Sequence, residues 1–323
     1  MNHVRRGLFR FATGALLVAP ILAHAQSPTK PYRIGLLQTD SSQTLLQQSL
    51  RELGYVEGRD VVYVVRYSEG RSDRLDDFAL DLVHLRVDVI VAANPGGVFS
   101  ATRATKTIPI VMTNTPDPVQ LGLVASLARP GGNITGTTTL TIDVTIKQLE
   151  LLKQAVPRAT RVALLWNRDN PWHARTVHEL QGRSGALGLQ IQTLEVRSPE
   201  ALDSAFRAMT TENVQALLVL ADPVTFFHRR RLAELAINHR VPMMGSLPEY
   251  AAAGSLMSYW ADTTEVARRA ASYVDRILKG AKPGDLPVEQ PTKFEFVANL
   301  RTAKALGITI PQSIVLRADR VIE

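Results

Sequence analysis

The chain contains the segment VIVAANP at residues 89–95 and a related segment, ALLVLADP, at residues 216–223. Each reads as an apolar strand that ends in a polar residue followed by proline. An earlier and a later strand accompany each segment in the same order: YRIGLL (32–37) and IPIV (108–111) in the first set, TRVALL (160–165) and VPMM (241–244) in the second. In both sets the proline follows the first strand by 61 residues, counted from Ile34 to Pro95 and from Val162 to Pro223. Chance similarity between α/β segments is the alternative, but three landmarks in one order favour tandem α/β halves, which usually face each other across a cleft.

The segments between these landmarks alternate between strand and helix patterns. Residues 61–67 form an apolar strand, whereas the leucines at positions 45, 46, 50 and 53 share one helical face that ends at Gly54. A strand at 133–139 and helices at 201–209 and 226–237 continue the alternation. This pattern predicts an α/β fold of two doubly wound, Rossmann-like lobes, whose parallel sheets are covered by helices on both faces.

The carboxyl-terminal part holds more elements than the two halves need. A strand at 255–259, a helix ending at Lys279-Gly280, a strand at 293–297 and a helix at 300–306 remain. We predict that the chain returns to the first lobe and then crosses again, so that several hinge crossovers join the lobes. The predicted lobes are residues 31–139 with about 261–291, and residues 140–260 with about 292–323.

Residues 1–25 have the pattern of an export signal. Arg5, Arg6 and Arg10 supply positive charge before an apolar run, and Ala23-His24-Ala25 forms a small-x-small cleavage site. The apolar run is too short to anchor the chain in a bilayer. We therefore predict a periplasmic protein cleaved after Ala25. The Arg5-Arg6 pair leaves both the general and the twin-arginine export routes open.

The charge and the cysteine count exclude several classes of protein. The formal net charge is +7, of which the signal arginines contribute three, so the mature chain is near +4. That excess is too small to indicate nucleic-acid binding. The basic run at 228–231 is read as a solvated helix face. The absence of cysteine excludes a disulfide framework and a lipoprotein anchor.

Loops at the carboxyl ends of parallel strands are the expected binding surface. Hydroxyl and glycine residues at helix starts leave backbone N–H groups free for a carboxylate, acidic residues can hold an ammonium group, and aromatic residues can stack on a ring. The candidate ligand-binding residues are Thr39, Ser41, Ser42, Asn94, Gly96 and Asp117 in the first half and Asn170, Trp172, Asp222, Glu249 and Tyr259 in the second.

Each candidate also has a purely structural interpretation. Ser41 and Ser42 suit a helix cap equally well, and Gly96 suits a turn. Asp117 and Asp222 stand next to prolines and suit turns, and Trp172 could belong to a hydrophobic core. The convergence of these loops on one rim is therefore a stronger prediction than any single residue.

Catalytic signatures are mostly absent from the sequence. It contains no Gly-x-Ser-x-Gly elbow, no phosphate-binding loop and no Gly-x-Gly-x-x-Gly fingerprint. His178-Glu179 begins like a zinc-protease helix, but position 182 is glycine, so the second histidine ligand is missing. We predict no catalytic residue, no metal and no cofactor, while an α/β enzyme that uses acidic residues of the same cleft stays open as an alternative.

Several segments match a known family, among them LGYVEG (53–58), SLARPGGNITG (126–136) and LPVEQPTKF (286–294). The chain resembles the tryptophan/tyrosine-type substrate-binding proteins of ABC importers from Pro31 to Glu323. The resemblance implies a type I periplasmic-binding fold with two lobes, three crossovers, a ligand in the cleft and no chemistry performed. It also implies a membrane permease and an ATPase as partners. Trp260 stands where a glycine is expected in relatives and would reshape the pocket if it faced the cleft.

The sequence thus predicts an exported, monomeric receptor for a small ligand, with an amino acid, and an aromatic one in particular, as the lead. A sensor that presents its ligand to a membrane receptor fits the sequence equally well and stays open.

Overall fold

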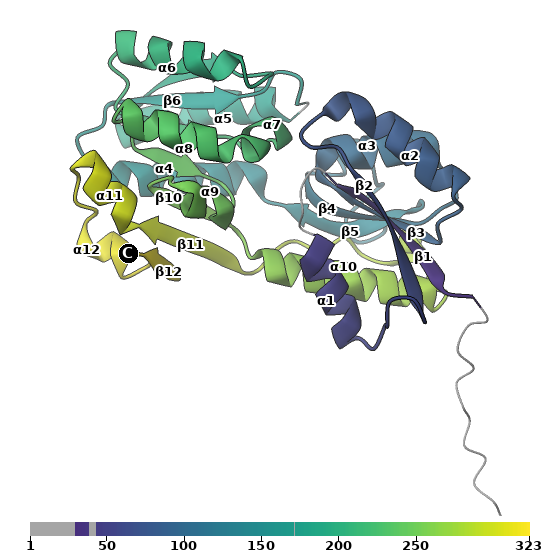
Figure 1. The fold of residues 1–323 in the computed structure, drawn as a ribbon. Helices are drawn as coiled ribbons and strands as arrows, with labels where there is room; N and C mark the ends of the chain where they lie inside the picture. The colour runs from purple at the N-terminus through teal and green to yellow at the C-terminus, as the bar shows by residue number, and fades with distance from the viewer. Residues whose placement is uncertain (1–29, 39–42, 171) are drawn as a thin grey trace, which may run out of the picture.

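The computed structural model describes residues 30–38, 43–170 and 172–323. The predicted export signal and the candidates Thr39, Ser41 and Ser42 lie outside the described residues. The chain forms two α/β lobes, each built on its own sheet (Figure 1). Among the described residues, no helix combines the length and apolar character needed to cross a membrane.

The first lobe is built on a parallel sheet with strand order β2-β1-β3-β4-β5. Its strands are β1 (Tyr32–Gln38), β2 (Val61–Tyr67), β3 (Val89–Ala93), β4 (Ile110–Pro116) and β5 (Ile134–Thr139). Within the described residues, four helices cover it: α1 (Gln43–Glu52), α2 (Leu75–His84), α3 (Asn94–Ala104) and, from much later in the chain, α10 (Thr263–Leu278). Alternate residues of β3 point to opposite faces: Val89 and Val91 pack with α1 and α10, whereas Ile90 and Ala92 pack with α2 and α3.

The second lobe is built on a sheet of order β12-β11-β10-β9-β8-β6-β7. Its strands are β6 (Arg161–Trp166), β7 (Gln190–Glu195), β8 (Ala216–Val219), β9 (Met243–Gly245), β10 (Met257–Ala261), β11 (Phe294–Asn299) and β12 (Arg320–Ile322). The core on one face includes residues of α4 (Thr141–Ala155), α5 (His173–Ser184), α11 (Leu300–Leu306) and α12 (Gln312–Val315). The core on the other includes residues of α6 (Ala201–Thr211), α8 (Arg229–Asn238) and α9 (Pro248–Ala253). The short helix α7 (Pro223–Phe227) follows β8.

The topology confirms the predicted fold class and explains the internal repeat. The order β2-β1-β3-β4-β5 in the first sheet corresponds strand for strand to β7-β6-β8-β9-β10 in the second. In both lobes an Asx-Pro pair starts the helix after the central strand, as Asn94-Pro95 for α3 and Asp222-Pro223 for α7. Proline suits this position because it has no N–H group to leave unpaired in the first turn of a helix.

Two elements differ from the sequence-based expectation. Strand β11 runs antiparallel to β10, whereas parallel sheets were expected. It enters the second sheet only after the chain has returned from the first lobe, so its direction is not fixed by a strand–helix–strand unit. The helix expected at 226–237 is two helices, α7 and α8, which meet at His228.

The described chain passes between the lobes three times: from β5 to α4, from β10 to α10, and from the 3-10 turn Pro283–Asp285 to β11. The third passage lies beside β5, since the Thr138 N–H donates to the Glu289 carbonyl (2.9 Å) and the Glu289 N–H donates to the Gly136 carbonyl (3.1 Å). The lobe boundaries predicted near residues 140, 261 and 292 stay a prediction.

Candidate ligand-binding site

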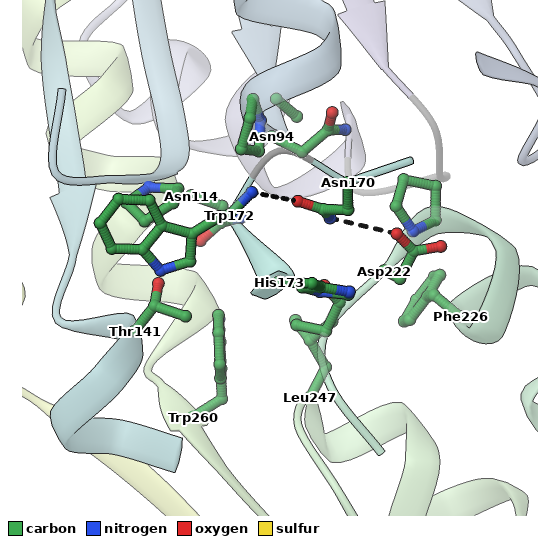
Figure 2. A pocket seen from close by; sticks show the side chains of 15 residues that line it. Asn94, Asn114, Thr141, Asn170, Trp172, His173, Asp222, Phe226, Leu247 and Trp260 are labelled. Atoms are coloured by element: carbon green, nitrogen blue, oxygen red, sulfur yellow. Dashed lines mark hydrogen bonds between the residues drawn. The ribbon is translucent and has the colours of Figure 1, made fainter. Parts of the chain in front are cut away.

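Loops from the carboxyl ends of both sheets enclose one cavity between the lobes (Figure 2). Its empty space, open solvent included, is about 730 Å³. The first lobe contributes the start of α3 and the end of β4, and the second contributes the ends of β6, β8 and β10 with α7. The lining residues are Ala93, Asn94, Pro95, Asn114, Pro116, Thr141, Asn170, Trp172, His173, Ala221, Asp222, Pro223, Phe226, Leu247 and Trp260.

Corresponding residues of the two repeats line the same cavity. Asn94 follows β3 in the first lobe and Asp222 follows β8 in the second. Each side chain supports the helix start behind it: Asn94 Oδ1 accepts from the Gly97 N–H (3.2 Å), and Asp222 Oδ1 accepts from the Val224 N–H (2.9 Å). Asn94 has a φ of 59°, a conformation that asparagine tolerates better than most residues. The repeat therefore places a neutral amide in one wall and a carboxylate in the other.

Asp222 is held in place by amide groups. Its side chain is buried, with a residue exposure of 6%. Asn170 Nδ2 donates to Asp222 Oδ2 (3.1 Å), and Asn167 Nδ2 lies 3.3 Å from both carboxylate oxygens. Asn170 Oδ1 in turn accepts from the Trp172 N–H (3.2 Å), so a chain of hydrogen bonds runs from Asp222 to the Trp172 backbone (Figure 2).

His173 is a neutral, buried residue of this wall. The Asn167 N–H donates to Nδ1 (3.0 Å), so Nδ1 carries no proton, and Nε2–H is left to donate to the Ala221 carbonyl (3.1 Å). Burial lowers the pKa of His173, although the nearby Asp222 charge acts in the opposite direction. The ring thus joins the end of β6 to the end of β8 without adding a charge.

Three aromatic side chains, Trp172, Phe226 and Trp260, form much of the remaining surface of the cavity. Trp172 and Trp260 are more than nine-tenths buried, and neither indole N–H has a hydrogen-bond acceptor among the described residues. The guanidinium group of Arg175 lies over the Trp172 ring, 5.4 Å from its centroid. The cavity therefore combines large apolar faces with a few polar groups, as small-molecule sites usually do.

The structure brings together four of the residues predicted for the site: Asn94, Asn170, Trp172 and Asp222 all line this cavity. Glu249 lines an adjoining cavity, which shares Asn114, Phe226 and Leu247 with the first.

The other described candidates lie elsewhere. Asp117 lines a separate hollow near Thr138 and Gln290, where its Oδ1 accepts from the Gln120 N–H (3.1 Å). Gly96 and Tyr259 line none of these three cavities. The ring of Tyr259 stacks on Phe294, with 5.6 Å between centroids.

Most of the other lining residues were not among the predicted site residues, and Asn114, His173 and Trp260 are examples. Asn114 stands in the Thr-Asn-Thr-Pro end of β4, and its positive φ of 51° has no clear sequence signature. Trp260 adjoins the predicted Tyr259, and strand alternation sends the two rings to opposite faces. Within the described residues, no group of three or more His, Cys, Asp or Glu side chains could hold a metal ion.

Comparisons with known proteins agree with one another. A family model described as ABC transporter substrate binding protein matches residues 38–322. The tyrosine-binding protein of Clostridioides difficile (strain R20291) is 26% identical over 262 residues, which make up 81% of this chain and 75% of that protein.

Two solved structures show the same similarity. The ABC domain from Streptococcus pneumonia in complex with L-Trp has a TM-score of 0.83 and 28% identity, over 91% of this chain and 100% of that one. A conserved domain protein from Vibrio cholerae O1 biovar eltor has a TM-score of 0.84 and 26% identity, over 90% of this chain and 100% of that one.

Proposed function

The chain belongs to the ABC transporter substrate-binding protein family, and from that premise we propose that it is an exported receptor that captures a small solute between its lobes and delivers it to a membrane permease. The membership confirms the resemblance predicted from the sequence motifs. The family is one of solute-binding proteins rather than enzymes, so the ligand is released chemically unchanged.

One observation carries the proposal: both lobes contribute walls to one cavity, with Asn94 on one side and Asp222 on the other. A ligand that touches both walls stabilises the arrangement in which the lobes are close together. Binding can therefore shift the population from open to closed, which is the signal a permease needs in order to distinguish loaded from empty receptors.

We propose an amino acid, and an aromatic one first, as the ligand. The tyrosine-binding relative and the L-Trp complex motivate this choice, and a carboxylate beside three aromatic side chains supports it. The proposed contacts are Asn94, Asn170, Trp172 and Asp222, joined by Asn114 and Trp260.

The cellular setting follows from the same premise. We propose that residues 1–25 direct export to the periplasm, and that the mature chain acts there as a monomer. Its partners are then the permease and ATPase subunits of an ABC importer.

A solute screen tests the proposal. Purified mature protein is melted with each of the proteinogenic amino acids, and every stabilising compound is titrated by calorimetry and then recovered and identified by mass spectrometry. We expect at least one amino acid to raise the melting temperature and to be recovered intact. Conversion of a bound compound into a product would contradict the receptor function.

A further inference from the structure

We propose that this cavity selects its ligand by positive charge: the solute is a protonated amine held against Asp222, and a carboxylate on the ligand is dispensable for binding. The inference rests on the proposed solute-binding function and narrows its ligand class. It separates amines from the sugars, polyols and organic acids that a cleft of this kind could equally enclose.

The charges of the cavity wall are unbalanced. Among the described residues that line it, Asp222 is the one acidic side chain, no lysine or arginine is present, and His173 is neutral. No described lysine, arginine or histidine nitrogen forms an ion pair with the Asp222 carboxylate within 4.0 Å. Arg229 lines the adjoining cavity instead, with its guanidinium stacked 4.4 Å from the Phe226 centroid.

The groups that do hold Asp222 are all neutral. The side-chain amides of Asn167 and Asn170 and the Val224 N–H orient the carboxylate without cancelling its charge. A buried carboxylate without a counter-ion is unfavourable, so a ligand that brings a positive charge gains more from this site than a neutral one. Hydrogen bonds between an ammonium group and a carboxylate are also among the stronger ones.

The aromatic surface of the cavity suits the same ligand. Trp172, Phe226 and Trp260 present ring faces, which attract cations as well as apolar groups. On the opposite wall, the described polar residues Asn94 and Asn114 carry no charge. A carboxylate on the ligand would therefore meet neutral amides and lie near Asp222, and its loss should cost little.

Matched ligands test the amine and the carboxylate of an amino acid one at a time. Calorimetry would compare L-tryptophan with tryptamine, which lacks the carboxylate, and with indole-3-propionate, which lacks the amine. The corresponding tyrosine and phenylalanine sets would be measured alongside. We expect each amine to bind within about 10-fold of its amino acid, and each acid about 100-fold more weakly, as loss of one partner of a buried charge pair predicts. An acid that binds as well as its amino acid, or an amine that binds 100-fold more weakly than it, overturns the inference.

Substitutions test whether the Asp222 carboxylate is the group that binds the amine. Asp222→Asn keeps the size of the side chain and should weaken amine binding about 100-fold. Asp77→Asn removes the same charge from an exposed position of α2, and should leave binding unchanged. If Asp222→Asn does not fold, the matched ligands on the unsubstituted protein decide the question alone.

A wider thermal-shift panel of primary amines, organic acids and polyols separates a failure of the proposed amine selectivity from a failure of the receptor function. Stabilisation confined to amines, amino acids included, supports the inference. Stabilisation by acids or polyols overturns it and leaves the receptor function standing. A panel in which no compound of any class binds contradicts the receptor function itself.

Discussion

His173 shows how a single buried side chain can hold a binding wall together. Its two ring nitrogens join the Asn167 N–H at the end of β6 to the Ala221 carbonyl at the end of β8. Asn167 at the end of β6 hydrogen-bonds to Asp222, and Ala221 at the end of β8 lines the cavity. The ring therefore sets the spacing between these two strand ends. Only the neutral ring can do this, because protonation of Nδ1 would place two donors against each other.

Stability should therefore fall in mild acid. The unfolded histidine takes up a proton near pH 6.5, whereas burial lowers the pKa of folded His173. Below pH 6.5 the unfolded state then binds more protons than the folded state, so the free energy of unfolding decreases as the pH falls from 6.5 through the lower folded pKa. Urea unfolding at pH 7 and pH 5 would measure the decrease.

His173→Asn is the matched variant, because its side-chain oxygen can accept from the Asn167 N–H and does not titrate. Its unfolding free energy should change less between pH 7 and pH 5 than that of the unsubstituted protein. Equal changes in both proteins would show that His173 does not carry the effect.

Gly136 is required by a close approach between two strands. It lies beside Met112 in the β4–β5 pair, where the register shifts, and has a φ of 129°. A Cβ atom there would stand 2.2 Å from the Met112 carbonyl oxygen. We expect Gly136→Ala to lower the free energy of unfolding by about 3 kcal/mol or more.

Gly132 provides the control for this substitution. A Cβ atom there would have no atom within 4 Å. Gly132→Ala should therefore stay within about 0.5 kcal/mol of the unsubstituted protein in the same urea titration. Similar losses for both alanine variants would refute the steric explanation.

The site was predictable where the sequence marks strand ends, and less so where it depends on side-chain direction. Asn94 and Asp222 were found because Asx-Pro after a strand is visible in the sequence and occurs twice. Tyr259 and Trp260 are adjacent aromatic residues, and a one-residue change in the assumed alternation exchanges which of them faces the cavity. His173 could not be found, because its role depends on two backbone groups brought together only by folding.

At the scale of elements, α10 fixes the third passage between the lobes. Arg269 on this helix pairs with Glu265 and donates to Glu289 Oε2 (2.7 Å) and to Thr292 Oγ1 (3.0 Å). The backbone of Glu289 is in turn paired with β5. Arg269 is a quarter exposed, so these contacts are less screened by solvent than those of a surface pair.

Loss of Arg269 should loosen this passage locally. In Arg269→Ala, we expect the amide protons of residues 289–294 to exchange about 10-fold faster, since local opening costs less once the charged hydrogen bonds are gone. Hydrogen exchange with mass spectrometry measures this directly. Arg268→Ala is the control, because Arg268 is 63% exposed and its contact with Glu52 is 3.8 Å long. Unchanged exchange at 289–294 in Arg269→Ala would contradict the role of this residue.

Elements with strong local signals were predicted well. Strand β2 and helix α11 have the predicted bounds, 61–67 and 300–306. The direction of β11 was not predicted, because it depends on how the chain returns from the other lobe rather than on local pattern. The division at His228 was missed for a different reason: Asp222 caps a helix that begins at Pro223, ahead of the apolar pattern that predicted a start at 226.

At the scale of the whole molecule, the two lobes also touch beside the cavity. Gly70 follows β2 in the first lobe, and a Cβ atom on it would lie 3.4 Å from the Pro223 carbonyl oxygen of α7 and 3.6 Å from Phe227 Cγ, the first ring atom. Phe227 is 43% exposed and adjoins Phe226, which lines the cavity. Because this contact joins the two lobes, we expect it to favour the closed, ligand-binding arrangement even though it touches no ligand.

The absence of cysteine makes the closing motion measurable with two introduced labels. Cysteines at Asp77 on α2 and Arg230 on α8, both exposed, would report the distance between the lobes by single-molecule energy transfer. We expect ligand to enrich one state with a shorter distance. Phe227→Ala should reduce the fraction of that state and raise the Kd about 3- to 10-fold, because the lost contact contributed only to the closed population. Leu316→Ala removes a side chain that is 76% exposed and far along the second lobe, and should change neither quantity. A distance distribution that ligand leaves unchanged would show that the lobes do not move on binding, and capture by closure would have to be abandoned.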